Sequence, residues 1–207
     1  MNTHSFDSLG NETHIPQGET MLCKFDNKGV VSYINDFYLE FSGHKIEDII
    51  GKTALELKHP DFPVTVFNHI MQYLFHKKNI HILVKDRTAT GKNYWFWTDF
   101  YYKTDAQGEL LDFYSYRKTA PQYINPKLIK LYDKLLKMEQ YTGLEIAQNY
   151  FEGLLEEAGT DFETYTMHLQ EELSKSSFPD DETDDFITGN SDRNKKKKKG
   201  FFGKLFK

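Results

Sequence analysis

The chain has 207 residues, with 26 Lys and Arg against 31 Asp and Glu and a formal net charge of −5. This length fits one packed domain with accessory helices or two small domains, and no stretch approaches the ~20 apolar residues of a membrane-spanning helix. Seven lysines fall in residues 195–207, so residues 1–194 carry −12, which argues against a general nucleic-acid-binding surface.

Residues 1–17 are polar and lack both the basic start and the apolar run of a secretory signal. We therefore expect a flexible leader and a cytoplasmic protein. Two short β-rich runs follow at 21–26 and 30–35, and the Asn27-Lys28-Gly29 segment between them favours a hairpin turn. Cys23, the single cysteine, excludes an internal disulfide and is expected to pack in the core.

The next part of the chain is predicted to be helical and then to return to strands. Residues 36–75 combine short helical turns with one longer helical pattern. Three strand candidates, at 79–87, 93–103 and 109–118, are rich in β-branched and aromatic residues. This order predicts an α+β domain over residues 18–120, with one five-stranded antiparallel sheet and its helices on one face.

Residues 121–174 are predicted to form a helical segment. Asn125-Pro126 suits a helix start, and two capping-box matches, Thr142 with Glu145 and Thr160 with Glu163, predict two more helices. These helices should pack on one another, on the sheet or on a second copy, because short helices are not stable alone in water. Residues 175–194 are polar and acidic, which predicts a disordered linker.

Four segments, GVVSYINDFYLEFSGHKIEDIIGK, KHPDFP, LVKDRTATGKNYWF and YSYRK, resemble the PAS domain of bacterial aerotaxis receptors. The resemblance runs from about residue 18 to residue 118, and KHPDFP is its most specific element. It implies a PAS fold, a five-stranded antiparallel sheet flanked by short helices that hold a ligand. Aerotaxis-type members bind flavin adenine dinucleotide (FAD) and signal its redox state, so the resemblance implies redox or oxygen sensing.

By position, the resemblance assigns the cofactor contacts to a small set of residues: Asn35, Lys58, His59, Asp61, Asp86 and Trp95. Two of them depart from the family pattern, which has arginine in place of Lys58 and asparagine in place of Asp86. An ionised Asp86 is a poor partner for flavin carbonyls, which accept hydrogen bonds. The alternatives are therefore an empty pocket or a different ligand, and sheet packing explains Trp95 equally well.

Histidines supply two further alternatives. His69, His76 and His81 lie near the helix and strand from which haem-binding PAS domains take an axial ligand, so haem is a second cofactor candidate. His168, next to acidic residues in the final predicted helix, is a candidate for phosphorelay. We recognise no catalytic motif and expect no enzyme.

Residues 195–207, KKKKKGFFGKLFK, predict a basic amphipathic tail, because the apolar side chains span about 140° of a helical wheel. The tail is similar to the membrane-targeting sequence of the septum-site-determining Min ATPase. Lysines add at most ~1 kcal/mol each near an anionic leaflet, so we expect reversible contact with the inner face of the cytoplasmic membrane. The predicted contacts are Lys195, Lys196, Lys197, Lys198, Lys199, Phe201, Phe202, Lys204, Leu205 and Phe206.

These patterns predict a PAS-type sensory signal-transduction protein. A change in the pocket would pass through the helices after residue 121 to a separate signalling partner or across a homodimer. The competing interpretation is a cofactor-free PAS module used for dimerisation. For the tail, the alternative to membrane contact is binding as a helix in a groove of a partner protein.

Overall fold

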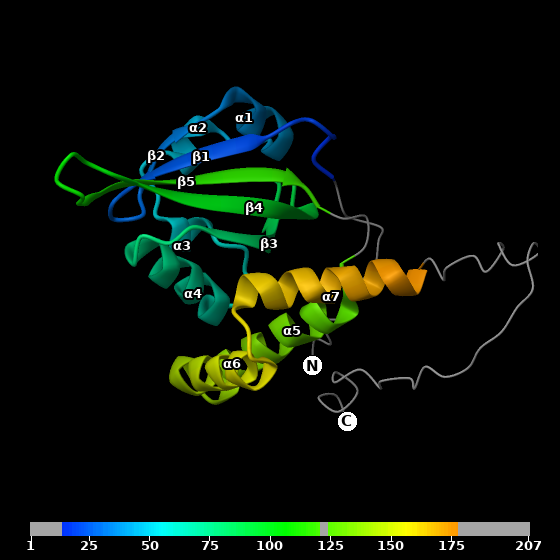
Figure 1. Ribbon diagram of the computed structural model, residues 1–207. Helices are drawn as coiled ribbons and strands as arrows, with labels where there is room; N and C mark the ends of the chain where they lie inside the picture. Colours follow the sequence, from blue (N-terminus) through cyan, green and yellow to red (C-terminus); the bar gives the residue numbers. More distant parts are fainter. Residues whose placement is uncertain (1–13, 121–123, 178–207) are drawn as a thin grey trace, which may run out of the picture.

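The computed structural model describes residues 14–120 and 124–177, so the predictions for residues 1–13, 178–194 and 195–207 lie outside the described residues. Five strands and seven helices occur in this part of the chain (Figure 1). They are β1 (Met21–Asp26), β2 (Val31–Ile34), α1 (Asp36–Ser42), α2 (Ile46–Ile49), α3 (Ala54–Leu57), α4 (Val64–Phe75), β3 (Ile80–Arg87), β4 (Asn93–Thr104), β5 (Leu110–Thr119), α5 (Pro126–Tyr141), α6 (Leu144–Ala158) and α7 (Phe162–Ser177).

The strands form one antiparallel sheet in the order β2-β1-β5-β4-β3, which confirms the predicted α+β class. The β1–β2 turn forms as expected, because the Asp26 carboxylate accepts the N–H groups of Lys28 and Val30, each at 2.9 Å. Gly29 adopts a φ of 79°, in the left-handed region that glycine favours. Strand β1 pairs with β5 and leaves β2 at the edge, so the first and last strands are neighbours inside the sheet.

Side chains alternate between the two faces of the sheet along every strand. The inner face, which α4 covers, carries Cys23, Phe96 and Phe113, all buried in the core as the Cys23 prediction required. Burial raises the pKa of the Cys23 thiol to about 12, so this residue is a packing group rather than a thiolate. The outer face carries Trp95 and Trp97 instead.

Helices α5 and α7 close the β3 edge of the sheet, next to α4 (Figure 1). The buried Tyr132 hydroxyl of α5 donates to the Leu83 carbonyl at 3.1 Å, and the Glu163 carboxylate of α7 accepts the His81 N–H at 3.0 Å. At the other edge, the Val31 N–H of β2 donates to the Lys52 carbonyl at 2.8 Å. Both edges are thus engaged by the chain itself.

Local details correct three sequence predictions. Ile15, inside the predicted leader, is 1% exposed, because it packs in the core while its carbonyl accepts the Thr119 hydroxyl at 2.7 Å. Thr142 does not cap the following helix, since its hydroxyl donates back to the Met138 carbonyl at the end of α5. At the start of α7 the cap is Asp161, whose carboxylate accepts the Thr164 N–H at 2.8 Å.

Two further observations bear on the ends of the helical segment. Helix α7 continues to Ser177, three residues into the predicted linker. Within residues 14–120 and 124–177, no helix is long and apolar enough to cross a membrane.

Candidate ligand-binding site

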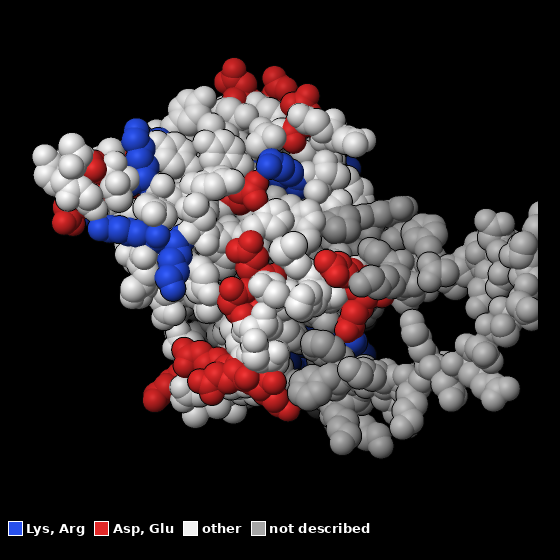
Figure 2. Space-filling view, in the orientation of Figure 1, with Lys and Arg blue, Asp and Glu red and all other residues white. Residues whose placement is uncertain are grey.

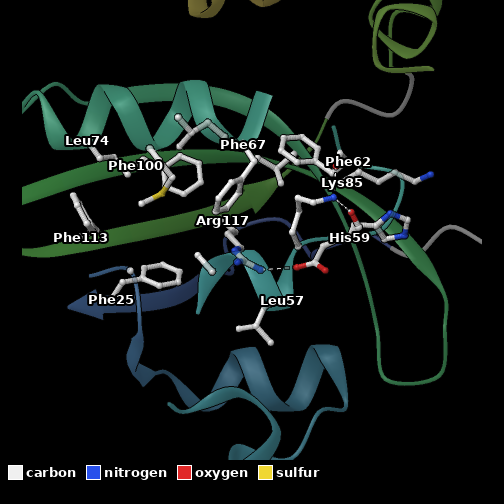
Figure 3. Close-up of a pocket in the computed structure, with 17 residues that line it drawn as sticks. Phe25, Leu57, His59, Phe62, Phe67, Leu74, Lys85, Phe100, Phe113 and Arg117 are labelled. Atoms are coloured by element: carbon white, nitrogen blue, oxygen red, sulfur yellow. Dashed lines mark hydrogen bonds and ion pairs between the residues drawn. The ribbon is translucent and has the colours of Figure 1, made fainter. Parts of the chain in front are cut away.

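A cavity of about 70 Å³ lies between the inner face of the sheet and helices α3 and α4. Figure 3 shows Phe25, Phe100 and Phe113 at one end, with Arg117 in the middle and Lys85 and His59 at the other end. The cavity therefore has an apolar end and a polar end. Its lining is completed by Gly29, Ala54, Leu57, Lys58, Phe62, Phe67, Ile70, Met71, Leu74, Val84 and Asp86.

An ion pair between Arg117 of β5 and Asp86 of β3 forms part of the cavity wall. The Arg117 Nη1 and Asp86 Oδ2 atoms are 2.9 Å apart, and the two side chains are only 13% and 15% exposed. The guanidinium lies 5.2 Å from the ring centroid of Tyr38 and 4.9 Å from that of Phe96. Burial opposes the charged form of Arg117, but Tyr38 and Asp86 raise its pKa overall, so the guanidinium is charged.

The loop between α3 and α4, residues 58–63, is held by internal hydrogen bonds at the polar end of the cavity. The Lys58 ammonium donates to the carbonyls of His59, at 2.8 Å, and of Phe62. His59 Nδ1 accepts the Asp61 N–H at 3.0 Å, which leaves Nε2–H to donate to the Asn93 side-chain carbonyl at 3.0 Å. Burial lowers the pKa of His59, so the imidazole is neutral in this arrangement.

The structure brings three of the six predicted cofactor residues to the cavity wall, namely Lys58, His59 and Asp86. Asp61 does not line the cavity, and its half-exposed carboxylate pairs with Lys85 at 3.3 Å. Asn35 does not line the cavity. Its side chain accepts the N–H groups of Leu22 and Tyr38 at 3.0 and 3.2 Å, so its position caps α1 and fixes β1.

Trp95 also lies outside the cavity, which corrects its assignment as a cofactor contact. It points to the outer face, where its ring is 5.8 Å from that of Tyr132 in α5. The physical reason is the period of two in a strand: Phe96 faces inward, so its neighbour Trp95 must face outward. Packing against the helical segment therefore accounts for Trp95.

The three histidines considered as haem ligands lie at separate places, and none lines the cavity. His69 packs against the rings of Phe151 and Phe162, at 5.2 and 6.0 Å. His76 is exposed at the end of α4, and His81 stacks on Trp97 on the outer face. Within residues 14–120 and 124–177, no group of three His, Cys, Asp or Glu side chains could hold a metal ion.

Sequence reasoning missed two residues of this site, Arg117 and Glu139. The Glu139 carboxylate of α5 accepts the N–H groups of Val64 and Thr65, at 3.1 and 2.7 Å, and so caps α4 immediately after loop 58–63. Arg117 could have been found from the alternation in β5, because it shares the inner face with Phe113 and Ser115. Glu139 gave no such signal, since it lies far along the chain from the helix that it caps.

The residues present do not fit flavin adenine dinucleotide in this conformation. Cavities for drug-sized ligands measure about 300–1,000 Å³, several times more than the cavity seen here. The predicted contacts also have partners within the protein: Asp86 pairs with Arg117, Asp61 pairs with Lys85, and Lys58 binds the carbonyls of its own loop. A bound flavin would require the loop and the ion pair to rearrange.

Part of this chain is similar in sequence to a known receptor. No protein-family model matches the chain. The aerotaxis receptor of Escherichia coli (strain K12) is 24% identical over 95 residues, which is 46% of this chain but only 19% of the receptor. The chain thus spans about a fifth of the length of this relative.

Among solved structures, the light-state structure of the blue-light photoreceptor Aureochrome1 LOV is similar with a TM-score of 0.46 and 13% identity, covering 55% of this chain and 88% of that one. A domain described as a light and redox sensing histidine kinase from Haloarcula marismortui has a TM-score of 0.43 and 17% identity, covering 50% and 90%. The five-stranded antiparallel sheet with its flanking helices has the arrangement of the expected PAS fold.

Proposed function

We propose that the chain is a sensory signal-transduction module, in which the state of the cavity passes through α4 and α5 to a separate signalling partner. The PAS-type domain supports a sensory role. The helices after residue 124 pack directly on α4 and on the β3 edge, so they are positioned to respond when the cavity wall moves. Redox or oxygen sensing is the specific form of this role that the aerotaxis resemblance favours.

The capping contact of Glu139 is the observation that carries this proposal. It joins the first turn of α4 to the last turn of α5. Helix α4 also contributes Phe67 and Ile70 to the lining of the cavity. Because a carboxylate at a helix N-terminus is held by free N–H groups and the helix dipole, a shift of α4 changes the contact directly. Helices α4 and α5 are therefore joined directly by this contact.

Amide hydrogen exchange tests this link with a small change in the cavity. Ile70→Val removes one methyl group from the lining, and we expect faster exchange in α5 as well as in α4. In a Glu139→Gln background the α5 response to Ile70→Val should disappear. Glu145→Gln, at an exposed carboxylate of α6, is the matched control and should leave the response intact. An α5 response that is unchanged by Glu139→Gln would disprove the coupling.

Flavin remains the cofactor prediction that an absorbance spectrum tests most directly. Purified protein that is yellow, with released FAD in stoichiometric amount, would support redox sensing. A Soret band would support haem. Colourless protein would argue against both cofactors.

A cofactor-free dimerisation module is the second candidate, and a specific observation favours it. The predicted flavin contacts are engaged within the protein, while the sheet and its turns expose Tyr33, Tyr101 and Leu111, at 50%, 42% and 44%. Sedimentation of the full chain with and without Tyr101→Glu tests this alternative. A dimer that dissociates in the variant supports it, and a monomer at high protein concentration contradicts it.

We also propose that residues 195–207 hold the protein at the cytoplasmic face of a membrane. One side of the described residues is unsuited to contact with an anionic membrane, because α6 exposes four carboxylates there. This acidic surface, visible in Figure 2, is formed by Glu145, Glu152, Glu156 and Glu157. The lysines of residues 195–207 would then supply the attraction to anionic lipid while α6 faces the cytoplasm. Vesicles of phosphatidylcholine and phosphatidylglycerol should bind the full chain at low salt and release it at high salt. A chain truncated after Asn194 is the control.

A further inference from the structure

We propose that the cavity binds a small monocarboxylate with a compact apolar body, whose carboxylate meets Arg117 and Lys58. This inference rests on the proposed sensory function and specifies the chemical class of its signal. It concerns a ligand of a size and charge different from those of flavin.

The apolar part of the ligand is defined by the rings at one end of the cavity (Figure 3). Phe25, Phe100 and Phe113 approach it from three strands, and Met71 and Leu74 approach it from α4. Such a surface favours a hydrocarbon chain or a ring and gains nothing from polar substituents. A water molecule needs about 10–15 Å³ on this scale, so 70 Å³ holds roughly five to seven water-sized groups.

The charge of the ligand follows from the charges that line the cavity. Lys58, Lys85 and Arg117 are cationic, whereas Asp86 is the one carboxylate among the lining residues. Asp61 pairs with Lys85 and Asp86 with Arg117, whereas the Lys58 ammonium donates to two backbone carbonyls and lies near the carboxylates of Glu139 and Asp61. An anionic ligand that reached Arg117 and Lys58 would form charge-assisted hydrogen bonds with both, which a neutral ligand of the same shape would form only more weakly.

The geometry of Arg117 gives this anion a place to bind. Its ion pair with Asp86 uses Nη1, whereas its buried Nε–H has no hydrogen-bond partner among the described residues. Opposite it in β4 lies Thr98, whose fully buried hydroxyl also has no partner, and the same holds for Ser115 on the inner face of β5. Buried donors without partners are costly, and a carboxylate oxygen that reached Arg117 would relieve this cost.

Isothermal titration calorimetry of the full chain tests the proposal with isovalerate and benzoate as probes. We expect saturable binding of one equivalent. The neutral isosteres isovaleramide and benzamide should bind about tenfold or more weakly, because a charge-assisted hydrogen bond becomes a neutral one. Equal affinity for acid and amide would overturn the anionic class. Failure of both acids to bind at millimolar concentration would overturn the site.

Variants then test the residues. Arg117→Met alone leaves Asp86 buried and unpaired and destabilises the domain, so the informative variant is Arg117→Met with Asp86→Leu, which removes the pair together. This double variant should keep its circular dichroism spectrum and lose about tenfold or more in carboxylate affinity. Lys58→Gln should weaken binding as well. Lys103→Gln, the same charge change at an exposed site of β4, should leave affinity within about twofold.

The result also separates this proposal from the proposed function. If the acids do not bind while Ile70→Val still alters exchange in α5 through Glu139, the ligand class is wrong and the sensory coupling stands. If the acids bind without any change in α5, the site stands and the coupling is wrong. Stoichiometric FAD that competes with benzoate would overturn the carboxylate assignment.

Discussion

The inner face of the sheet encloses a cavity and an ion pair, whereas the part of the outer face that meets α5 is filled by closely packed aromatic rings in tilted and edge-on contacts. Trp95, Tyr132 and Phe162 lie 5.8 to 6.4 Å apart there, and Phe151 lies 4.9 Å from Phe162. The inner side therefore keeps space beside a buried ion pair, whereas buried polar atoms without a partner occur on both sides of the described domain. The helical side resembles an ordinary protein interior.

This difference shows how one domain can combine a cavity that can rearrange with a tightly packed helical side that holds its position. Local strain and unpaired groups persist only where the surrounding structure is firmly held. The hydrogen bond of Tyr132 to the Leu83 carbonyl fixes α5 to the β3 edge next to the cavity. The contacts of Tyr132, Glu139 and Glu163 all join the helical segment to the parts of the domain around the cavity. Each of the following predictions tests one side of this division.

The largest effect is expected when the ion pair on the inner face is broken. Arg117→Met should lower the free energy of unfolding by about 3–5 kcal/mol, because Asp86 is left buried without its partner. Adding Asp86→Leu should restore most of the loss, since two apolar side chains can replace a buried pair. Urea unfolding measures both. If the double variant is as unstable as the single one, the pair is not the cause.

A smaller effect is expected at the β3 edge. Tyr132→Phe removes the buried hydroxyl that donates to Leu83 and leaves that carbonyl without this donor. We expect a loss of about 1–2 kcal/mol in the free energy of unfolding. Tyr141→Phe, at a side chain that is 77% exposed, is the control and should change stability by less than about 0.5 kcal/mol.

The stability of the helical side should depend on pH, because His69 packs there. Burial lowers the pKa of His69, and its Nε2 has no partner among the described residues, so the folded state holds the neutral ring. The unfolded state takes up a proton near its ordinary pKa of about 6.5, hence stability should fall as the pH drops below that value.

His69→Phe keeps an aromatic ring beside Phe151 and removes this titration. Thermal unfolding between pH 7.5 and 5 should therefore show a shallower decline in the variant. His76→Gln, at an exposed histidine of the same helix, should leave the slope unchanged. A slope that is the same in His69→Phe would assign the dependence to His59, whose pKa burial also lowers.

The smallest effect is expected when side-chain volume is added at the cavity, and the same kind of change in the helical segment serves as the comparison. Val84→Ile extends a methyl group toward the cavity and should change the free energy of unfolding by less than about 0.5 kcal/mol. Ala147→Val places its extra methyl groups at a fully buried position of α6 and should cost about 1–3 kcal/mol. Equal costs at the two positions would show that the cavity is not available space.

Much of the fold could be predicted from the sequence, because the signals were local. The turn at Gly29, the β-rich runs and Asn125-Pro126 each depend on residues that are neighbours in the chain. The helix starts near Thr142 and Thr160 were misjudged in detail, since Gly143 and Asp161 are adjacent residues that serve as the caps instead. Propensity alone does not choose between neighbouring caps.

The site was less predictable because it depends on contacts between distant residues. Asp86 could be identified as unusual, but its partner Arg117 lies 31 positions away and is set by the strand register. Glu139 lies 75 positions from Val64. Trp95 was assigned to the pocket through the resemblance, with sheet packing as the alternative, and its parity in β4 puts it on the other face.

The engaged edges of the sheet have a consequence for how this protein meets others. An open edge strand is a template on which a second chain can add a strand, and such pairing leads to aggregation or fibre growth. Here the side chains of Tyr132 and Glu163 form hydrogen bonds with backbone groups of β3. The Lys52 carbonyl accepts the Val31 N–H of the four-residue strand β2. Strand addition at these positions would have to displace contacts that the chain makes with itself, so a partner that binds this domain would have to contact side chains on its faces and helices.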